Sequence, residues 1–152
     1  MGVKLTPEEL DAFLDKGHTL IVATVRKSGE PFLVPVWYVW RDGAFWVGTP
    51  ARSSKVAHIK RDPRVCCMVE EGEAWLDLKA VIMNCEASVV EDTGKIAEIE
   101  AAIDRKYEGF RMDRSKLPEA TRNHYATGRV ILRFTPKPGE LRSWYNRKIR
   151  MG

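Results

Sequence analysis

The spacing of apolar and polar positions near the start of the chain predicts a helix. Leu10, Phe13 and Leu14 recur at the three- and four-residue intervals that place side chains on one helical face. Thr6 precedes this stretch and Glu9 follows it by three residues, which is the pattern of a capping box. We therefore expect a short amphipathic helix to open the fold.

The pattern then changes to segments rich in β-branched and aromatic residues, separated by short turns that contain glycine or aspartate. These segments predict six strands, and the spacing between and after them predicts further helical stretches. The predicted strands are Thr19–Arg26, Pro31–Trp40, Ala44–Thr49, Arg64–Glu70, Trp75–Val90 and Arg129–Phe134; the helical segments are Ser53–Lys60, Ile96–Tyr107 and, in part, Met112–Tyr125; Pro136–Gly139 is expected to break the chain before an aromatic and basic tail. This order favours a small closed or split β-barrel with helices at its ends.

The second predicted strand is apolar on both faces. A strand with one face in water would alternate with polar residues, so we expect one face to line the core. The other face should meet a ligand, a second subunit or a covering helix. Pro35 cannot donate a hydrogen bond to a neighbour, so the strand should be interrupted or unpaired there, beside aromatic residues suited to a planar ligand. The two faces consist of Phe32, Val34, Val36, Tyr38 and Trp40, and of Leu33, Pro35, Trp37 and Val39.

The segment Thr49–Lys55 carries the clearest chemistry, because it leaves a strand and enters a helix. Helix N-termini offer free backbone N–H groups and a positive dipole end, which suit a phosphate. Ser53 and Ser54 add hydroxyl donors, and Arg52 and Lys55 add positive charge. Taken alone, the segment also fits a capped helix with solvated charges.

The charge balance is mildly basic, with 25 Lys and Arg against 21 Asp and Glu and a net charge of +4 over 152 residues. This excess is compatible with an anionic ligand or partner. Nucleic acid is the rival interpretation of the basic tail, but no recognised nucleic-acid motif accompanies it. We therefore expect no nucleic-acid partner.

Other site chemistry and targeting signals are not evident. The three cysteines, Cys66, Cys67 and Cys85, lack CxxC spacing, so neither a disulfide framework nor a metal site is expected. No catalytic Ser/His/Asp or Cys/His set is apparent. No apolar run approaches the roughly 20 residues needed to span a bilayer, and no signal-peptide pattern opens the chain. A cytoplasmic protein without a membrane partner is the expectation.

Several stretches, in order, resemble the pyridoxamine 5'-phosphate oxidase-like family of FMN-binding split barrels. The length and the Arg-Ser-x-Lys pattern look most like its flavin/deazaflavin oxidoreductase branch. The resemblance covers roughly residues 5–92 and, more loosely, the closing strand. It is carried by Ala23-Thr24-Val25, Ser28-Gly29, Pro31, Val34–Tyr38, Thr49–Lys55, Ile59, Arg61–Val65 and Glu86–Asp92.

The resemblance implies a mainly β (α+β) fold, a six-stranded split β-barrel with peripheral helices, in one domain over residues 1–152. It also implies a homodimer with the cofactor at the subunit interface. The cofactor is expected to be FMN or the deazaflavin coenzyme F-420, although members of the branch also use FAD or haem. The implied cofactor-binding residues are Pro35, Val36 and Trp37 along the ring, and Thr49, Arg52, Ser53, Ser54 and Lys55 around the phosphate.

The predicted function is an oxidoreductase that transfers a hydride between the bound cofactor and an unknown small organic substrate. No catalytic residue is assigned. One alternative is a non-enzymatic cofactor-binding or storage protein, and another is a pyridoxamine 5'-phosphate oxidase-like FMN enzyme. The tail Arg142–Arg147 lacks the histidine found in the substrate motif of the oxidase proper, which argues against the last alternative. A nucleic-acid-binding barrel is the third.

Overall fold

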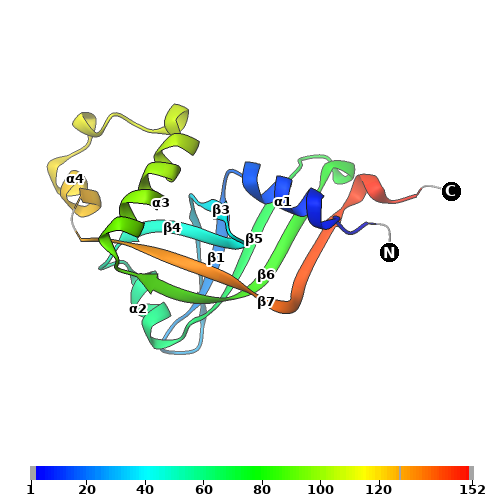
Figure 1. Cartoon of the computed structure of the whole chain (residues 1–152), viewed down its shortest axis with the longest axis horizontal. Coiled ribbons are helices and arrows are strands. Elements are labelled where there is room, and N and C mark those ends of the chain that lie inside the picture. Colours follow the sequence, from blue (N-terminus) through cyan, green and yellow to red (C-terminus); the bar gives the residue numbers. More distant parts are fainter. Residues whose placement is uncertain (1–2, 127, 151–152) are drawn as a thin grey trace.

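One curved antiparallel sheet of seven strands forms the frame of the molecule (Figure 1), and the computed structural model describes residues 3–126 and 128–150. The strand order is β2-β1-β5-β6-β7-β4-β3. The strands are β1 Leu20–Val25, β2 Pro31–Val36, β3 Val39–Arg41, β4 Ala44–Pro50, β5 Arg64–Glu71, β6 Lys79–Val90 and β7 Arg129–Tyr145. A mainly β split barrel with peripheral helices is thereby confirmed.

In the described residues, four α-helices and four short 3-10 helices connect or flank the strands. They are α1 Pro7–Lys16, α2 Ser54–Arg61, α3 Thr93–Lys106 and α4 Glu119–Ala126, with η1 Trp75–Asp77, η2 Glu108–Phe110, η3 Arg114–Lys116 and η4 Asn146–Lys148. The predicted capping box on α1 is present, with both the Thr6 and the Glu9 bonds formed. In Figure 1, α3 and α4 lie at one end of the molecule and the end of β7 at the other, where the Tyr145 N–H donates to the Val3 carbonyl at 2.8 Å.

The predicted count of six strands is wrong, because the predicted strand Pro31–Trp40 is two strands in the structure. Pro35 does not cause the break: it pairs in register with Ile21. Since β2 is an edge strand, the missing N–H of proline is tolerated there. The break falls instead at Trp37 and Tyr38, where the chain passes from one edge of the sheet to the other. We call this two-residue junction the seam.

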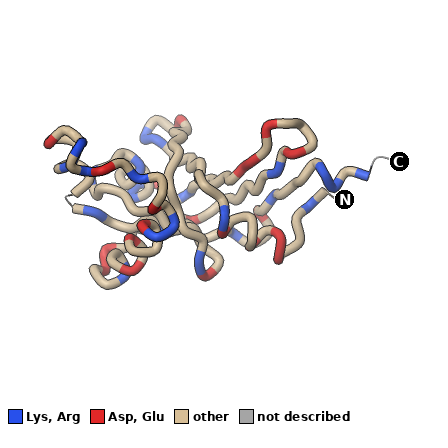
Figure 2. The backbone as a smooth tube through the Cα atoms, turned by 90° about the horizontal axis from the view of Figure 1, so that it is seen from above, with Lys and Arg blue, Asp and Glu red and all other residues tan. Residues whose placement is uncertain are grey.

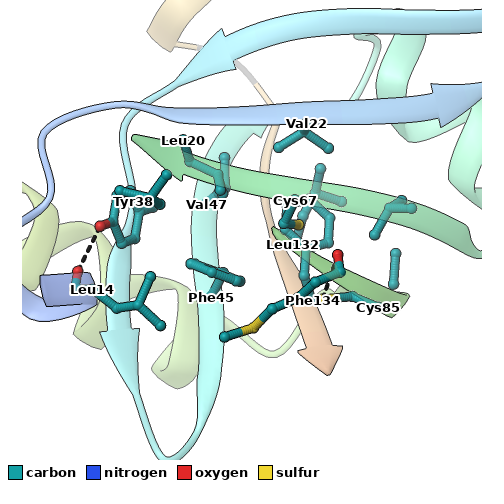
Figure 3. Packing of buried hydrophobic residues seen from close by; sticks show 14 of the residues in the cluster. Leu14, Leu20, Val22, Tyr38, Phe45, Val47, Cys67, Cys85, Leu132 and Phe134 are labelled. Carbon is teal, nitrogen blue, oxygen red and sulfur yellow. Dashed lines mark hydrogen bonds between the residues drawn. The ribbon is translucent and has the colours of Figure 1, made fainter. Parts of the chain in front are cut away.

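Tyr38 explains the break physically. Its side chain is fully buried, and its hydroxyl donates a hydrogen bond of 2.5 Å to the Leu14 carbonyl (Figure 3). Its backbone N–H donates to the Tyr107 hydroxyl at 3.1 Å. A side chain thus satisfies the backbone where a neighbouring strand would otherwise do so.

Two further boundaries differ from the prediction. Pro136–Gly139 does not end the last strand, because β7 continues to Tyr145 past a register shift opposite Met83 and Cys85. Such an irregularity is where a sheet accommodates proline. The predicted strand Trp75–Val90 begins only at Lys79, after η1.

The buried side chains form two clusters on opposite sides of the sheet. The larger one fills the barrel and includes Phe13 and Leu14 of α1, which pack beside strand residues such as Phe45 and Phe134. Figure 3 shows part of this packing. The smaller cluster joins α3 to β3, β4 and β7, and comprises Val39, Ala44, Trp46, Ile99, Ala102, Ile103, Tyr107 and Ile131. The outer face of this half of the sheet is therefore covered by α3.

Candidate cofactor site

A cavity of about 740 Å³ lies where the ends of β2 and β4, the start of α2 and one face of α3 meet the segment between α3 and β7. Its volume falls within the range of roughly 300–1,000 Å³ typical of ligand pockets. Its lining comprises Thr19, Val34, Pro35, Val36, Trp37, Gly48, Thr49, Pro50, Lys55, Glu100, Ile103, Phe110, Arg111, Met112, Arg114, Leu117, Arg122, Tyr125 and Arg129.

The structure brings five of the eight predicted cofactor-binding residues to this cavity and leaves three outside its lining. The five are Pro35, Val36, Trp37, Thr49 and Lys55. Arg52 instead lines a neighbouring cavity of about 390 Å³, together with Pro50, Ala51, Asn123, His124 and Gly128. Ser53 and Ser54 line neither cavity.

The side of the cavity formed by β2 ends in an aromatic stack. The Trp37 indole lies parallel to the Tyr107 ring, with centroids 4.4 Å apart and an interplanar angle of 5°. The Tyr107 hydroxyl donates a hydrogen bond to the His18 carbonyl at 2.8 Å, and this bond fixes the position of the Tyr107 ring. Because Tyr107 covers one face of Trp37, a planar ligand would have to meet its other face or its edge.

Another part of the cavity lining comes from the end of β4 and the first turn of α2. Thr49 is buried, and its hydroxyl donates to the Ser53 hydroxyl oxygen at 3.1 Å. Ser53 is the residue before the helix, but its side chain makes no capping bond, and the first turn of α2 contains no acidic residue. The helix start therefore lacks a negative partner of its own, and an anion would complement it.

Lys55 is the cation of α2 that faces the cavity. Burial, and secondarily the charge of Arg129, lower the pKa of its ammonium group. A lysine held partly away from water beside a second cation gains from the approach of an anion.

Arg129 is a further cation of this site that the sequence analysis missed. Its Nε donates to Glu100 Oε1 at 2.7 Å, and its Nη1 donates to the Tyr125 carbonyl at 3.1 Å. Gly48 makes room for this pair, since a Cβ there would lie 2.8 Å from Glu100 Oε1. An isolated glycine in an apolar strand is a signal of such close approach, and it could have indicated the site.

The segment between α3 and β7 supplies the rest of the lining and was also missed. The structure places Phe110, Arg111, Met112, Arg114, Leu117, Arg122 and Tyr125 on the cavity. The partial helix predicted over Met112–Tyr125 is present as η3 and α4, but a helical prediction alone does not place these side chains on a cavity. Arginines alternate here with apolar residues, and this combination of charge and apolar surface is the signal that could have indicated a ligand.

Other features of the described residues also characterise the chain. His58 Nδ1 lies 2.8 Å from the hydroxyl oxygen of the buried Thr24, away from the lining of the cavity. Within residues 3–126 and 128–150, no three His, Cys, Asp or Glu side chains gather in a way that could hold a metal ion. Over the same part of the chain, no helix has the length and apolar character required to cross a membrane.

Comparison with known proteins identifies the family. The pyridoxamine 5'-phosphate oxidase family model matches residues 6–142. A search of the curated proteins finds no match.

Solved structures share the fold across nearly the whole chain. A conserved hypothetical protein from Mycobacterium tuberculosis is 27% identical, with a TM-score of 0.82 over 99% of this chain and 93% of that one. An FAD-binding protein from Mesorhizobium loti is 16% identical, with a TM-score of 0.68 over 92% of this chain and 94% of that one. An F420 reductase is 21% identical, with a TM-score of 0.67 over 90% and 98%. With the family match spanning most of its length, the chain belongs to the pyridoxamine 5'-phosphate oxidase family of split barrels.

Proposed function

We propose that this protein binds FMN or the deazaflavin coenzyme F-420 in the 740 Å³ cavity and serves as an oxidoreductase toward a small organic substrate. The observation that carries the proposal is the pairing of two unlike groups in one cavity. The lining includes Lys55, a cation from the first turn of α2, and Trp37, a member of the aromatic stack. A phosphate joined to a flat ring offers a matching pair of groups.

The residues of the chain divide the work of binding. Lys55 and the first turn of α2 would hold the phosphate, with Arg129 adding positive charge nearby. Pro35, Val36 and Trp37 would lie along the ring. Arg52, on the neighbouring cavity, would contact an outlying part of the cofactor. Once bound, the ring supplies the hydride chemistry, and the protein supplies orientation and exclusion of water.

The cofactor-bound form is proposed to be a homodimer. The strand registers place Leu33, Ala23 and Cys66 in one row across the outer face of β2, β1 and β5. A second row runs through Pro35, Ile21, Met68 and Ile82. Leu33 is 62% exposed in the single chain, and Pro35 belongs both to this face and to the cavity. A second copy seated on this apolar face would border the cofactor.

The test of the cofactor site is a fluorescence titration of the protein with FMN and, separately, with F-420. The Lys55→Ala variant should bind the preferred cofactor at least about tenfold more weakly, because it loses a charge-assisted bond to phosphate. Lys60→Ala is the matched control: Lys60 lies on the same helix but outside the cavity, paired with Glu91. Equal affinities for the wild type and Lys55→Ala would disprove the phosphate assignment.

Turnover separates the enzyme from the alternative, a cofactor-binding or storage protein. The fold itself does not decide between them, since one matched structure is named an FAD-binding protein and another an F420 reductase. The enzyme predicts that the reduced, protein-bound cofactor is reoxidised by an added organic acceptor much faster than the free cofactor. Binding without any such acceleration across a panel of acceptors would favour storage.

A further inference from the structure

The segment Phe110–Tyr125, which we call the cover segment, combines positive charge with exposed apolar side chains. It connects α3 to β7 and arches away from the barrel at the upper left of Figure 1. Seven of its residues line the cavity. The proposed function assigns the cofactor phosphate to Lys55 and the start of α2. The cover segment is therefore free to bind a different group in the same cavity.

The cations around the cavity differ in whether the protein already neutralises them. Arg111 pairs with Asp104 at 2.6 Å, and Arg129 pairs with Glu100. In the part of the chain that the structure describes, no carboxylate lies within 4.0 Å of the guanidinium of Arg114 or Arg122. These two arginines therefore face the cavity with their charge unpaired.

The apolar side chains of the cover segment are exposed to an unusual degree. Phe110, Met112 and Tyr125 are 64%, 66% and 49% exposed, and all three line the cavity. Large apolar side chains held open beside a pocket are typical of a ligand contact surface. A molecule that covers them would recover the free energy of burying apolar surface.

The helical repeat of α4 places Arg122 on the side of the helix that faces the main cavity. Arg122 and Tyr125 are three residues apart, so they share one helical face, and both line the main cavity. Asn123 and His124 lie on the other side and line the smaller cavity with Arg52. The helix thus forms a wall between two cavities and presents an arginine and an aromatic ring together to the larger one.

We propose that the cover segment is the substrate subsite, and that Arg114 and Arg122 bind a carboxylate on an apolar or aromatic substrate. This inference rests on the proposed function, because it assigns the α2 end of the cavity to the cofactor. It names the substrate class as planar or apolar carboxylic acids. Guanidinium groups bind carboxylates through two parallel hydrogen bonds, which gives geometric selection as well as charge.

A carboxylate could also come from the glutamate chain of F-420, so the experiment uses probes that separate the two sources. The probes are 2-naphthoate, its neutral counterpart 2-naphthamide, FMN and F-420. Binding of each to the full chain is measured by isothermal titration calorimetry, and the two naphthalene probes are also measured on protein saturated with FMN. FMN carries no glutamate chain, so any carboxylate preference in that complex belongs to the added probe.

The expected result is that 2-naphthoate binds at least about tenfold more tightly than 2-naphthamide. Arg114→Gln and Arg122→Gln should each remove most of that preference while leaving FMN affinity unchanged. Lys116→Gln is the matched control, because Lys116 is an exposed cation of the same segment that does not line the cavity. It should leave both affinities as they are.

Three outcomes would overturn the substrate assignment. The first is equal affinity for 2-naphthoate and 2-naphthamide in the wild type. The second is an equal loss in Lys116→Gln, which would show a general charge effect. The third is a loss of F-420 affinity in the arginine variants with 2-naphthoate binding unchanged, which would assign these arginines to the cofactor chain. Failure of the proposed function differs from all three: neither cofactor binds, while 2-naphthoate still does.

Discussion

Site residues that are close together in the sequence were predictable from it. Site residues that only strand pairing brings together were not. Thr49 and Lys55 lie on one strand-to-helix junction, so their neighbours in space are their neighbours in sequence. Arg129 follows Lys55 by more than 70 residues and reaches it only because β4 and β7 pair, with Arg129 opposite Pro50. No pattern of residues in the sequence indicates that β4 and β7 pair.

The depressed pKa of Lys55 leads to a prediction about pH. Phosphate binding favours the charged ammonium, so affinity should be highest below the lowered Lys55 pKa and fall as the pH rises through it. The decline should therefore begin at a lower pH than the ordinary lysine value of 10.5 would allow. Cofactor titrations between pH 7.5 and pH 10 measure this, above the second ionisation of phosphate near pH 6.

The arginine variant supplies the control for that profile. Lys55→Arg keeps a positive charge that does not titrate in this range, so its affinity should stay level as the pH rises. A falling profile of the same shape in Lys55→Arg would show that another group causes the decline.

At the scale of elements, helix α1 was predictable because its signals are local, and the seam was not. The capping box and apolar stripe of α1 lie within ten residues of each other. The break between β2 and β3 depends on Tyr38 entering the core and bonding to Leu14, a contact that no periodicity records. Val36, Tyr38 and Trp40 on one face of Pro31–Trp40 pack on the core, whereas Leu33 on the other face is 62% exposed. The apolar run also concealed that two strands share the segment.

Gly17, just after α1, is predicted to be intolerant of a side chain. A Cβ there would lie 2.2 Å from the Tyr38 hydroxyl oxygen and 2.7 Å from Val69 Cγ1, both buried in the core. Gly17→Ala should lower the free energy of unfolding by about 1–3 kcal/mol, the usual effect of overpacking. Urea denaturation measures the change.

Gly109→Ala is the control, because nothing lies within 4 Å of a Cβ at that position. It should leave stability nearly unchanged. If Gly17→Ala were as stable as Gly109→Ala, the close packing of α1 against Tyr38 would be disproved.

The whole molecule exposes one half of its sheet and covers the other with α3. The family and the barrel could be predicted from the order of short motifs, but the apolar face could not, because it depends on the registers of four strands. In Figure 2, segments with Lys and Arg are interspersed with segments with Asp and Glu along the tube.

Leu33→Glu should disrupt the proposed dimer. A carboxylate on this apolar face would be buried without a partner on association, so the variant should be monomeric by light scattering and should bind cofactor more weakly. Ala97→Glu is the control, because Ala97 is an exposed residue of α3, which covers the other half of the sheet. A dimeric Leu33→Glu, or a monomeric wild type at micromolar concentration, would contradict the proposed interface.

The seam has a consequence for how such a protein can change over evolutionary time. The two sheet edges on either side of Trp37 and Tyr38 are held at their distance by the hydroxyl of Tyr107 and the ammonium of Lys106, which donates to the Tyr38 carbonyl at 3.0 Å. Lys106 ends α3 and Tyr107 follows it, three residues before the cover segment begins at Phe110. Insertions, deletions and substitutions that follow α3 can therefore reshape the mouth of the cavity without altering a single strand pair. In this way the barrel can come to bind new ligands while its strand pairing, and so its fold, stays the same.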